Sequence, residues 1–215
     1  MRPLVLVGMS ERTWMRRGGK VCGRSCAVVA VLAGMAWVTM PRGLAQDVNR
    51  DSVQRQDWKA TLRDRLPLLG HRNWILVVDS AYPLQTAPGM EVVETHTGLL
   101  PTLTEALAQI GESRHVRANV FEDAELKDIP DSDAPGIAGF RNNVQTVLRG
   151  AKLANAPTAL PHLTLIGKVA DASKDFRILV LKSDEALPYT SVFLQLDCKY
   201  WSDQAEKRLR ALEQK

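Results

Sequence analysis

Residues 71–84, HRNWILVVDSAYPL, contain the segment around which the rest of the chain is organised. Its centre, Trp74–Val78, is an unbroken run of five apolar residues, mostly β-branched or aromatic. Such a run is typical of a strand covered on both faces. Asp79 ends the run and the turn-forming residues 80–83 follow, so we expect a carboxylate at the carboxyl end of a buried strand.

Helical and strand patterns alternate on both sides of this segment. Apolar residues recur at helical spacing from Trp58 to Leu69 and predict a helix that ends at Gly70. The alternation predicts an α/β sandwich. The further predicted helices are Pro101–Ile110, Phe140–Leu153 and Ser202–Gln214; the further predicted strands are Met90–Val93, His115–Phe121, Leu163–Ile166, Arg177–Leu181 and Ser191–Leu196; a long surface loop is predicted at Glu122–Gly139.

The net charge of +4 is concentrated at the start of the chain. Residues 1–45 hold seven Lys and Arg residues and a single acid, which leaves 21 basic and 23 acidic residues in 46–215. The remainder is therefore slightly acidic. Nucleic-acid binding, which depends on a basic surface, is not expected of this part of the chain.

Residues 1–45 resemble an export signal. Basic residues between 16 and 24 precede a largely apolar run of 15 residues, Cys26–Met40, and small residues follow up to Ala45. The run is shorter than the roughly 20 residues that a spanning helix needs. We therefore predict a signal peptide cleaved near Ala45, with translation starting at Met1 or Met15; an uncleaved anchor is the alternative. The mature protein would be periplasmic or extracellular, without stable membrane insertion, and would begin with a flexible polar arm, residues 46–57.

Cofactor and metal motifs are missing from the sequence. There is no GxGxxG or GxxxxGK[ST] phosphate-binding motif, no GxSxG and no HExxH. Cys198 is the only cysteine after the leader, so neither an internal disulfide nor a thiolate metal site can form there. The four histidines are too scattered for a typical metal site, and we expect neither cofactor nor metal.

Three side chains are candidates for chemistry. Asp79 follows a buried strand, and ligand sites in open α/β sheets gather at the carboxyl ends of strands. His71 precedes the same strand, and Tyr189 stands before the last strand. Each has a purely structural alternative: His71 as a loop residue, Asp79 as a turn-capping residue and Tyr189 as a half-buried strand residue.

The order of these motifs resembles the D-ribose pyranase and L-fucose mutarotase (RbsD/FucU) family. The resemblance covers roughly residues 60–201 and implies a three-layer α/β/α sandwich in a single domain, residues 58–215. The segments that carry it are Leu69-Gly70-His71, Asp79-Ser80-Ala81-Tyr82-Pro83, Gly98-Leu99-Leu100-Pro101, Lys182-Ser183-Asp184-Glu185 and Pro188-Tyr189-Thr190-Ser191.

The family interconverts ring forms or anomers of free monosaccharides without a cofactor. By resemblance His71 would donate the proton, Asp79 and Ser191 would bind sugar hydroxyls, and Tyr189 would line the pocket. A second family histidine, which precedes the helix before the last two strands, lacks a convincing counterpart. Gly167-Lys168 occupies that neighbourhood, and His162 lies a few residues earlier.

A straight strand from Trp74 to Asp79 would be roughly 16 Å long. One monosaccharide could not reach both His71 and Asp79 across it. Either the loop before the strand folds back, or neighbouring subunits share a site, and the family's ring-like homo-oligomers favour sharing. We therefore expect an oligomer with Tyr189 close to His71 or Asp79 of another chain. The alternatives to a sugar isomerase are a non-catalytic carbohydrate-binding protein and a structural oligomer of the envelope.

Overall fold

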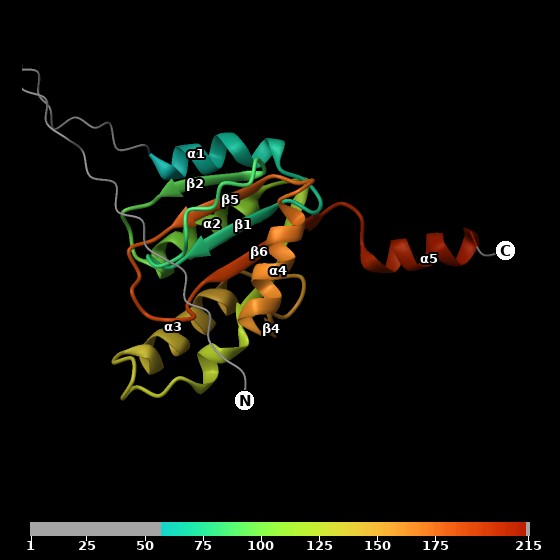
Figure 1. Ribbon diagram of the computed structural model, residues 1–215. Coiled ribbons are helices and arrows are strands. Elements are labelled where there is room, and N and C mark those ends of the chain that lie inside the picture. The colour runs from blue at the N-terminus through green and yellow to red at the C-terminus, as the bar shows by residue number, and fades with distance from the viewer. Residues whose placement is uncertain (1–56, 214–215) are drawn as a thin grey trace, which may run out of the picture. The chain divides into compact units, whose positions relative to one another are not determined.

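The computed structural model describes residues 57–213, so the predicted leader, most of the predicted arm and the end of the last predicted helix lie outside the described residues. The described part consists of a six-stranded mixed sheet and five α-helices (Figure 1). The helices are α1 (Trp58–Arg65), α2 (Leu99–Glu112), α3 (Ile137–Gly150), α4 (His162–Ala172) and α5 (Asp203–Glu213); the strands are β1 (Trp74–Val78), β2 (Met90–Glu94), β3 (Val116–Asp123), β4 (Thr158–Leu160), β5 (Ile178–Lys182) and β6 (Val192–Cys198); η1 (Leu66–Leu68) and η2 (Ala124–Asp128) are 3₁₀ turns.

The sheet has the strand order β2-β5-β1-β6-β3-β4. β6 is antiparallel to both of its neighbours, β1 and β3, whereas the other neighbouring pairs are parallel. The carboxyl ends of five strands therefore meet the start of β6 along one edge, which we call the carboxyl edge. The start of β1 meets the end of β6 at the opposite amino edge. This topology decides which loops can form a common site.

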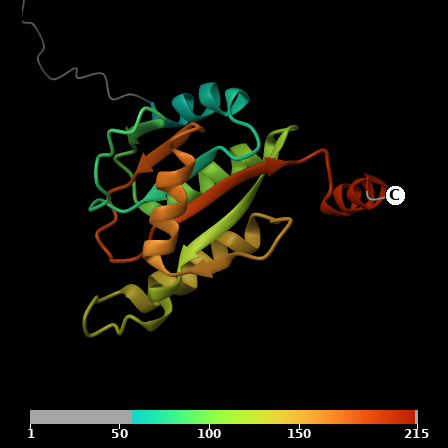
Figure 2. The same ribbon diagram turned by 45° about the vertical axis from the view of Figure 1, so that its right-hand side comes forward.

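The central strand β1 is buried along its whole length, as its composition predicts. Ile75 and Val77 belong to the core shared with α1, α2 and α3. Leu76 and Val78 point to the other face and belong to the core shared with α4. Both views place α4 in front of the sheet and α2 behind it (Figures 1 and 2). The predicted α/β/α layering is confirmed.

The first helix, α1, ends earlier than the sequence predicts. Asp57, the last residue of the predicted arm, caps α1: its Oδ1 accepts from the backbone N–H groups of Lys59 and Ala60. The α-helix stops at Arg65 rather than continuing to Leu69, and a 3₁₀ turn that contains Pro67 follows. Proline has no N–H for the next α-helical hydrogen bond, which explains the earlier end.

The predicted strand Leu163–Ile166 is wrong, because these residues lie in α4. Leu165 and Val169, four residues apart, are buried, while Leu163 is 82% exposed. The short sequence LTLI has strand composition, but its apolar residues continue at helical spacing beyond Gly167. The strand of this region is instead β4, which lies just before α4 and pairs with β3.

The predicted surface loop Glu122–Gly139 is also wrong at both ends. β3 continues through Glu122 to Asp123, and both acids are buried. α3 begins at Ile137, directly after Gly136, whose φ of 95° suits glycine. Two buried carboxyl groups at the end of a strand were not expected, because a stretch rich in acids, prolines and glycines usually marks a solvent-exposed loop.

Among residues 57–213, none of the helices has the length and hydropathy that crossing a bilayer requires.

Gly89→Ala is expected to lower the free energy of unfolding by about 1–3 kcal/mol, as overpacking does. A Cβ at this position would lie 2.6 Å from the Phe176 carbonyl oxygen and closer still to that of Ser173. Both obstacles are backbone atoms that cannot rotate away. Gly139→Ala is the control: a Cβ there meets nothing within 4 Å, and alanine favours the helix by about 1 kcal/mol. Urea unfolding that ranks the two variants equally would contradict the prediction.

Candidate functional site

The carboxyl edge of the sheet gathers polar side chains from four separate segments. Asp79 follows β1, Asp123 ends β3, His162 begins α4 after β4, and the loop before β6 supplies Tyr189 and Ser191. Ser191 is hydrogen-bonded to Asp79, and His162 to Asp123. A ring contact joins Tyr189 to His162. The sequence-predicted residues Asp79, Tyr189 and Ser191 therefore lie along one edge of a single chain.

Asp79 and Ser191 form the first contact pair. The Ser191 hydroxyl donates to Asp79 Oδ2 at 2.7 Å, and the Ala81 backbone N–H donates to Asp79 Oδ1 at 3.0 Å. Ser191 is buried, whereas Asp79 is partly exposed. The carboxylate is thus held in one orientation and keeps an accessible side on which it can accept a hydrogen bond from a hydroxyl.

His162 and Asp123 form the second pair. His162 Nδ1 lies 3.1 Å from Asp123 Oδ1. The backbone N–H of His162 donates to both carboxylate oxygens of Glu125 at 3.0 Å, which fixes the start of α4. No other side chain of the described residues is bonded to Nε2, and the His162 side chain is 36% exposed. Nε2 is therefore free to exchange a proton with a ligand.

Asp123 has an unusual environment for a carboxylate. Its side chain is fully buried, and Oδ2 has no hydrogen-bond partner among the described residues. Burial raises the pKa of Asp123 to about 6, against the opposing charge and hydrogen bond of His162, while Glu125 and Asp79 raise it further. His162 and the carboxyl group with the raised pKa form a candidate acid–base pair.

Tyr189 lies over the His162 ring. The ring centroids are 5.4 Å apart at an interplanar angle of 88°, an edge-to-face contact. Tyr189 is 40% exposed, and its φ of 55° is in the left-handed region, where non-glycine residues are uncommon. Strained backbone of this kind clusters at functional sites. The ring offers a ligand one apolar face, with a hydroxyl at its tip.

His71 lies at the amino edge, at the other end of β1, and is not brought to the other candidates within one chain. Its Nδ1 is 2.8 Å from Asp197 Oδ1, and Arg117 donates to Asp197 Oδ2. Partial burial favours a higher Asp197 pKa, but hydrogen bonds from Arg117, the Cys198 backbone and His71 outweigh it and lower the pKa. The loop before β1 does not fold back over the strand, so only a second chain could bring a His71 to the carboxyl edge.

His162 and Asp123 are the residues that sequence reasoning missed. The family histidine was expected near Gly167-Lys168, a few residues after His162, and residues 163–166 were predicted to be a strand. Since α4 begins at His162, this histidine does precede the helix before the last two strands. Proline at 161 directly before it is the sequence signal that could have located the helix start.

Tyr82, three residues after Asp79, lies in the core against α4. Its hydroxyl accepts from Gln85 Nε2 at 2.9 Å, and burial raises its pKa to about 12. It therefore supports the turn after Asp79 rather than facing a ligand.

Within residues 57–213, one group of side chains has the spacing of a metal site. Glu94, His96 and Asp184 each place a ligand atom within 4.8 Å of the others, and all three are exposed. They follow β2 and β5, on the far side of β1 from His162. Exposed groups of this kind are common without an ion, and the acid–base pair described above does not include them.

Comparisons with known proteins give structural matches only. No family model matches the chain, and no curated protein matches it significantly. Bacillus subtilis RbsD complexed with D-ribose is a similar structure, with 20% sequence identity and a TM-score of 0.44 over 64% of this chain and 92% of that chain. FucU from Bifidobacterium longum has 15% identity and a TM-score of 0.47 over 64% of this chain and 94% of that chain. The fucose mutarotase in complex with L-fucose from Streptococcus pneumoniae has 16% identity and a TM-score of 0.46 over 66% of this chain and 95% of that chain.

Proposed function

We propose that this protein binds a free monosaccharide at the carboxyl edge and interconverts its ring forms or anomers by acid–base proton transfer. The observation that carries the proposal is the convergence of a histidine–carboxyl pair, an oriented carboxylate and an exposed aromatic ring on one edge of the sheet. The ordered motifs shared with the RbsD/FucU family support the same substrate class.

The reaction moves protons between sugar oxygens and needs no cofactor. The anomeric hydroxyl loses its proton while the ring oxygen gains one, the C1–ring oxygen bond breaks, and the open-chain aldehyde recloses from either face or through another hydroxyl. His162 supplies or takes the proton at Nε2, because its Nδ1 is occupied by Asp123. Asp123 orients the ring and stabilises the imidazolium when it forms.

Asp79, Ser191 and Tyr189 serve as the binding residues. The accessible side of the Asp79 carboxylate accepts from a sugar hydroxyl, and Ser191 keeps that carboxylate in place. Tyr189 covers one side of the sugar ring and contacts His162. In this proposal a second chain completes the site. The role of His71 and the ring-like oligomer stay predictions: His71 would act from that second chain.

A non-catalytic carbohydrate-binding protein is the second candidate. The position of His71 at the amino edge favours it, because a single chain then contributes one histidine to the site. Both candidate functions have the same ligand and the same binding residues, Asp79 and Tyr189. They differ only in whether the bound sugar is converted.

NMR exchange spectroscopy on ribose, fucose and related sugars separates the candidates. We expect the wild-type protein to accelerate exchange between ring forms or anomers of at least one sugar above the spontaneous rate. Saturable binding in calorimetry together with spontaneous exchange rates would support the second candidate. Neither binding nor acceleration across the panel would refute the carbohydrate assignment.

We also propose that the protein is exported, on the basis of the leader sequence in residues 1–45. Amino-terminal sequencing of the protein recovered from cell fractions should find a start near Gln46 outside the cytoplasm. A cytoplasmic protein that still carries residues 16–45 would contradict export.

A further inference from the structure

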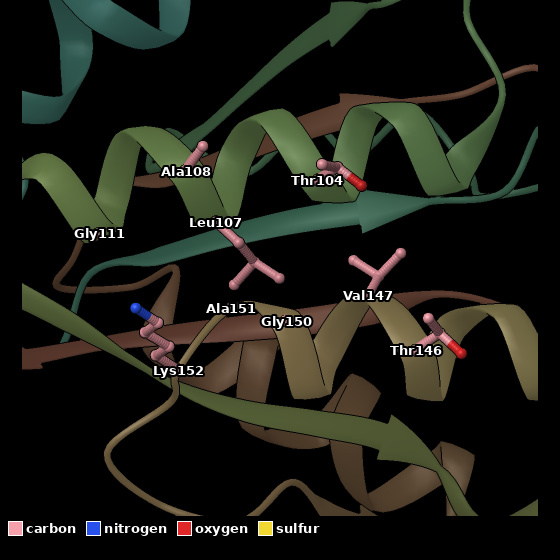
Figure 3. A pocket seen from close by; sticks show the side chains of 9 residues that line it. All are labelled: Thr104, Leu107, Ala108, Gly111, Thr146, Val147, Gly150, Ala151 and Lys152. Carbon is pink, nitrogen blue, oxygen red and sulfur yellow. The ribbon is translucent and has the colours of Figure 1, made fainter.

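The acid–base role proposed for His162 depends on where its imidazole is held, because a catalytic group acts only from the right position. The cavity of about 430 Å³ between α2 and α3 takes no part in holding it (Figure 3). Leu107 and Val147 point towards each other across that gap, and none of the candidate site residues lines it. The contacts that hold His162 come instead from the end of β3 and from η2.

Helix α4 begins without a capping side chain of its own. The residue before it is Pro161, which makes no side-chain hydrogen bond to the helix, and the first turn contains no acidic residue. The first N–H groups of a helix have no acceptor within the helix, and they favour negative charge beside them. The backbone N–H of His162, the first residue of α4, therefore needs an acceptor from another segment.

Glu125 supplies that acceptor from η2, 37 residues earlier in the chain. Both of its carboxylate oxygens accept from the His162 backbone N–H at 3.0 Å. A serine or aspartate just before a helix usually fills this role. Here the cap is delivered by a distant segment, so the start of α4 depends on the position of η2.

One short segment, residues 123–125, holds His162 at two points. Asp123 Oδ1 lies 3.1 Å from Nδ1 of the ring, and Glu125 binds the backbone N–H. The pairing of β3 with β4 sets Asp123 opposite Leu160, two residues before His162, and this fixes the register of the two segments. Helix ends fray readily, and loss of the Glu125 contact would release the first turn of α4 and the ring with it.

We propose that Glu125 is a positioning residue for His162: its hydrogen bonds keep the first turn of α4 formed, and the formed turn holds the imidazole against Asp123 and Tyr189. Glu125 itself neither contacts the sugar nor exchanges a proton with it. The inference deepens the proposed function and rests on it for the effect on catalysis, but not for the effect on the position of the ring.

Three variants separate the hydrogen bond of Glu125 from its charge. Glu125→Ala removes both acceptors, whereas Glu125→Gln keeps one acceptor and removes the charge. Burial is the main cause of the raised pKa of Asp123, and the charge of Glu125 adds to it, so this separation is needed. Asp128→Ala is the matched control, because Asp128 is another carboxylate of η2, its side chain is 78% exposed and its partner is the neighbouring Lys127.

Sugar exchange is measured on each variant well below its melting temperature. We expect kcat of Glu125→Ala to fall about 10- to 100-fold, because a displacement of about 1 Å can cost that much. KM should change less than kcat, since Asp79 and Tyr189 bind the sugar. Glu125→Gln and Asp128→Ala should keep most of the wild-type kcat. A wild-type kcat in Glu125→Ala, or equal losses in the alanine and glutamine variants, would overturn the proposal.

Proton NMR of the His162 ring without sugar tests the positioning separately. The ring meets Tyr189 edge to face with centroids 5.4 Å apart, so the ring current of Tyr189 makes its resonances sensitive to position, and His162→Gln assigns them by their loss. We expect Glu125→Ala to shift or broaden these resonances at constant pH, while Glu125→Gln, which removes the same charge, and Asp128→Ala leave them nearly unchanged.

Unchanged resonances in Glu125→Ala would overturn the positioning role of Glu125. An equal change in Glu125→Gln would also overturn it, because the charge rather than the hydrogen bond would then be responsible. If the wild type converts no sugar, the proposed function fails, and the NMR comparison alone decides whether Glu125 positions His162.

Discussion

Replacing His162 by glutamine is expected to reduce the catalysed sugar exchange by at least about 100-fold, the usual contribution of a general acid–base group. Glutamine keeps a polar side chain but cannot change its protonation state near neutral pH. The backbone N–H of residue 162 still donates to Glu125, so α4 should start normally. Exchange rates and the melting temperature are measured together, and we expect only the rate to change.

Two further histidine variants show whether the loss of rate is specific to His162. His96→Gln is the control, because His96 is exposed and lies beyond β1 from the site, and its rate should equal the wild-type rate. His71→Gln tests the residue that the family resemblance predicts to be the proton donor. A loss at His71 as large as that at His162 indicates that a second chain contributes to the site. An unchanged rate in His162→Gln would remove the acid–base role assigned to that residue.

Asp123→Asn is expected to stabilise the protein at pH 8 while it lowers the exchange rate. A carboxyl whose folded-state pKa is raised binds its proton more tightly when folded, so the stability of the wild type falls as pH rises from about 4 to about 6. A shift from 3.8 to about 6 corresponds to at most roughly 3 kcal/mol. Asparagine is neutral at all these pH values and avoids that cost.

Urea unfolding at pH 4, 6 and 8 measures the effect. The gain in the free energy of unfolding should be largest at pH 8 and smallest at pH 4, where the folded wild-type carboxyl is protonated and the unfolded one is about half protonated. Asp197→Asn should have the opposite effect on stability. The folded protein lowers the pKa of Asp197, so removing this charge should lower the free energy of unfolding at neutral pH. Equal destabilisation by Asp123→Asn at every pH would contradict the environment assigned to Asp123.

Much of the fold could be predicted because its strongest signals are local. The run Trp74–Val78 is apolar without interruption, which identifies a strand covered on both faces whatever the neighbours are. Asp79 follows it directly, so its place at a strand end also follows from the chain order. Tyr189 was located in the same way, by its position before the last strand, whereas Ser191 was identified through the family resemblance.

His162 and Asp123 could not be located by such signals. A four-residue apolar segment taken by itself fits a strand and a helix equally well. Pro161 before it and Val169 after it favour the helix, and the packing of Leu165 against the sheet decides it. Asp123 belongs to an acidic, proline-containing stretch that is typical of exposed loops, yet the pairing of β3 with β4 buries it.

By itself the sequence determined the α/β class, the buried central strand and the carboxylate at its end, because these depend on residues adjacent along the chain. Only the tertiary structure decided which histidine lies at the same edge of the sheet as that carboxylate. β6 runs antiparallel to β1 and β3, so the carboxyl edge collects the ends of β1 and β3 and the start of β6, while His71 stays at the amino edge. Strand direction is set by packing between distant segments, and a linear pattern of residues does not encode it locally.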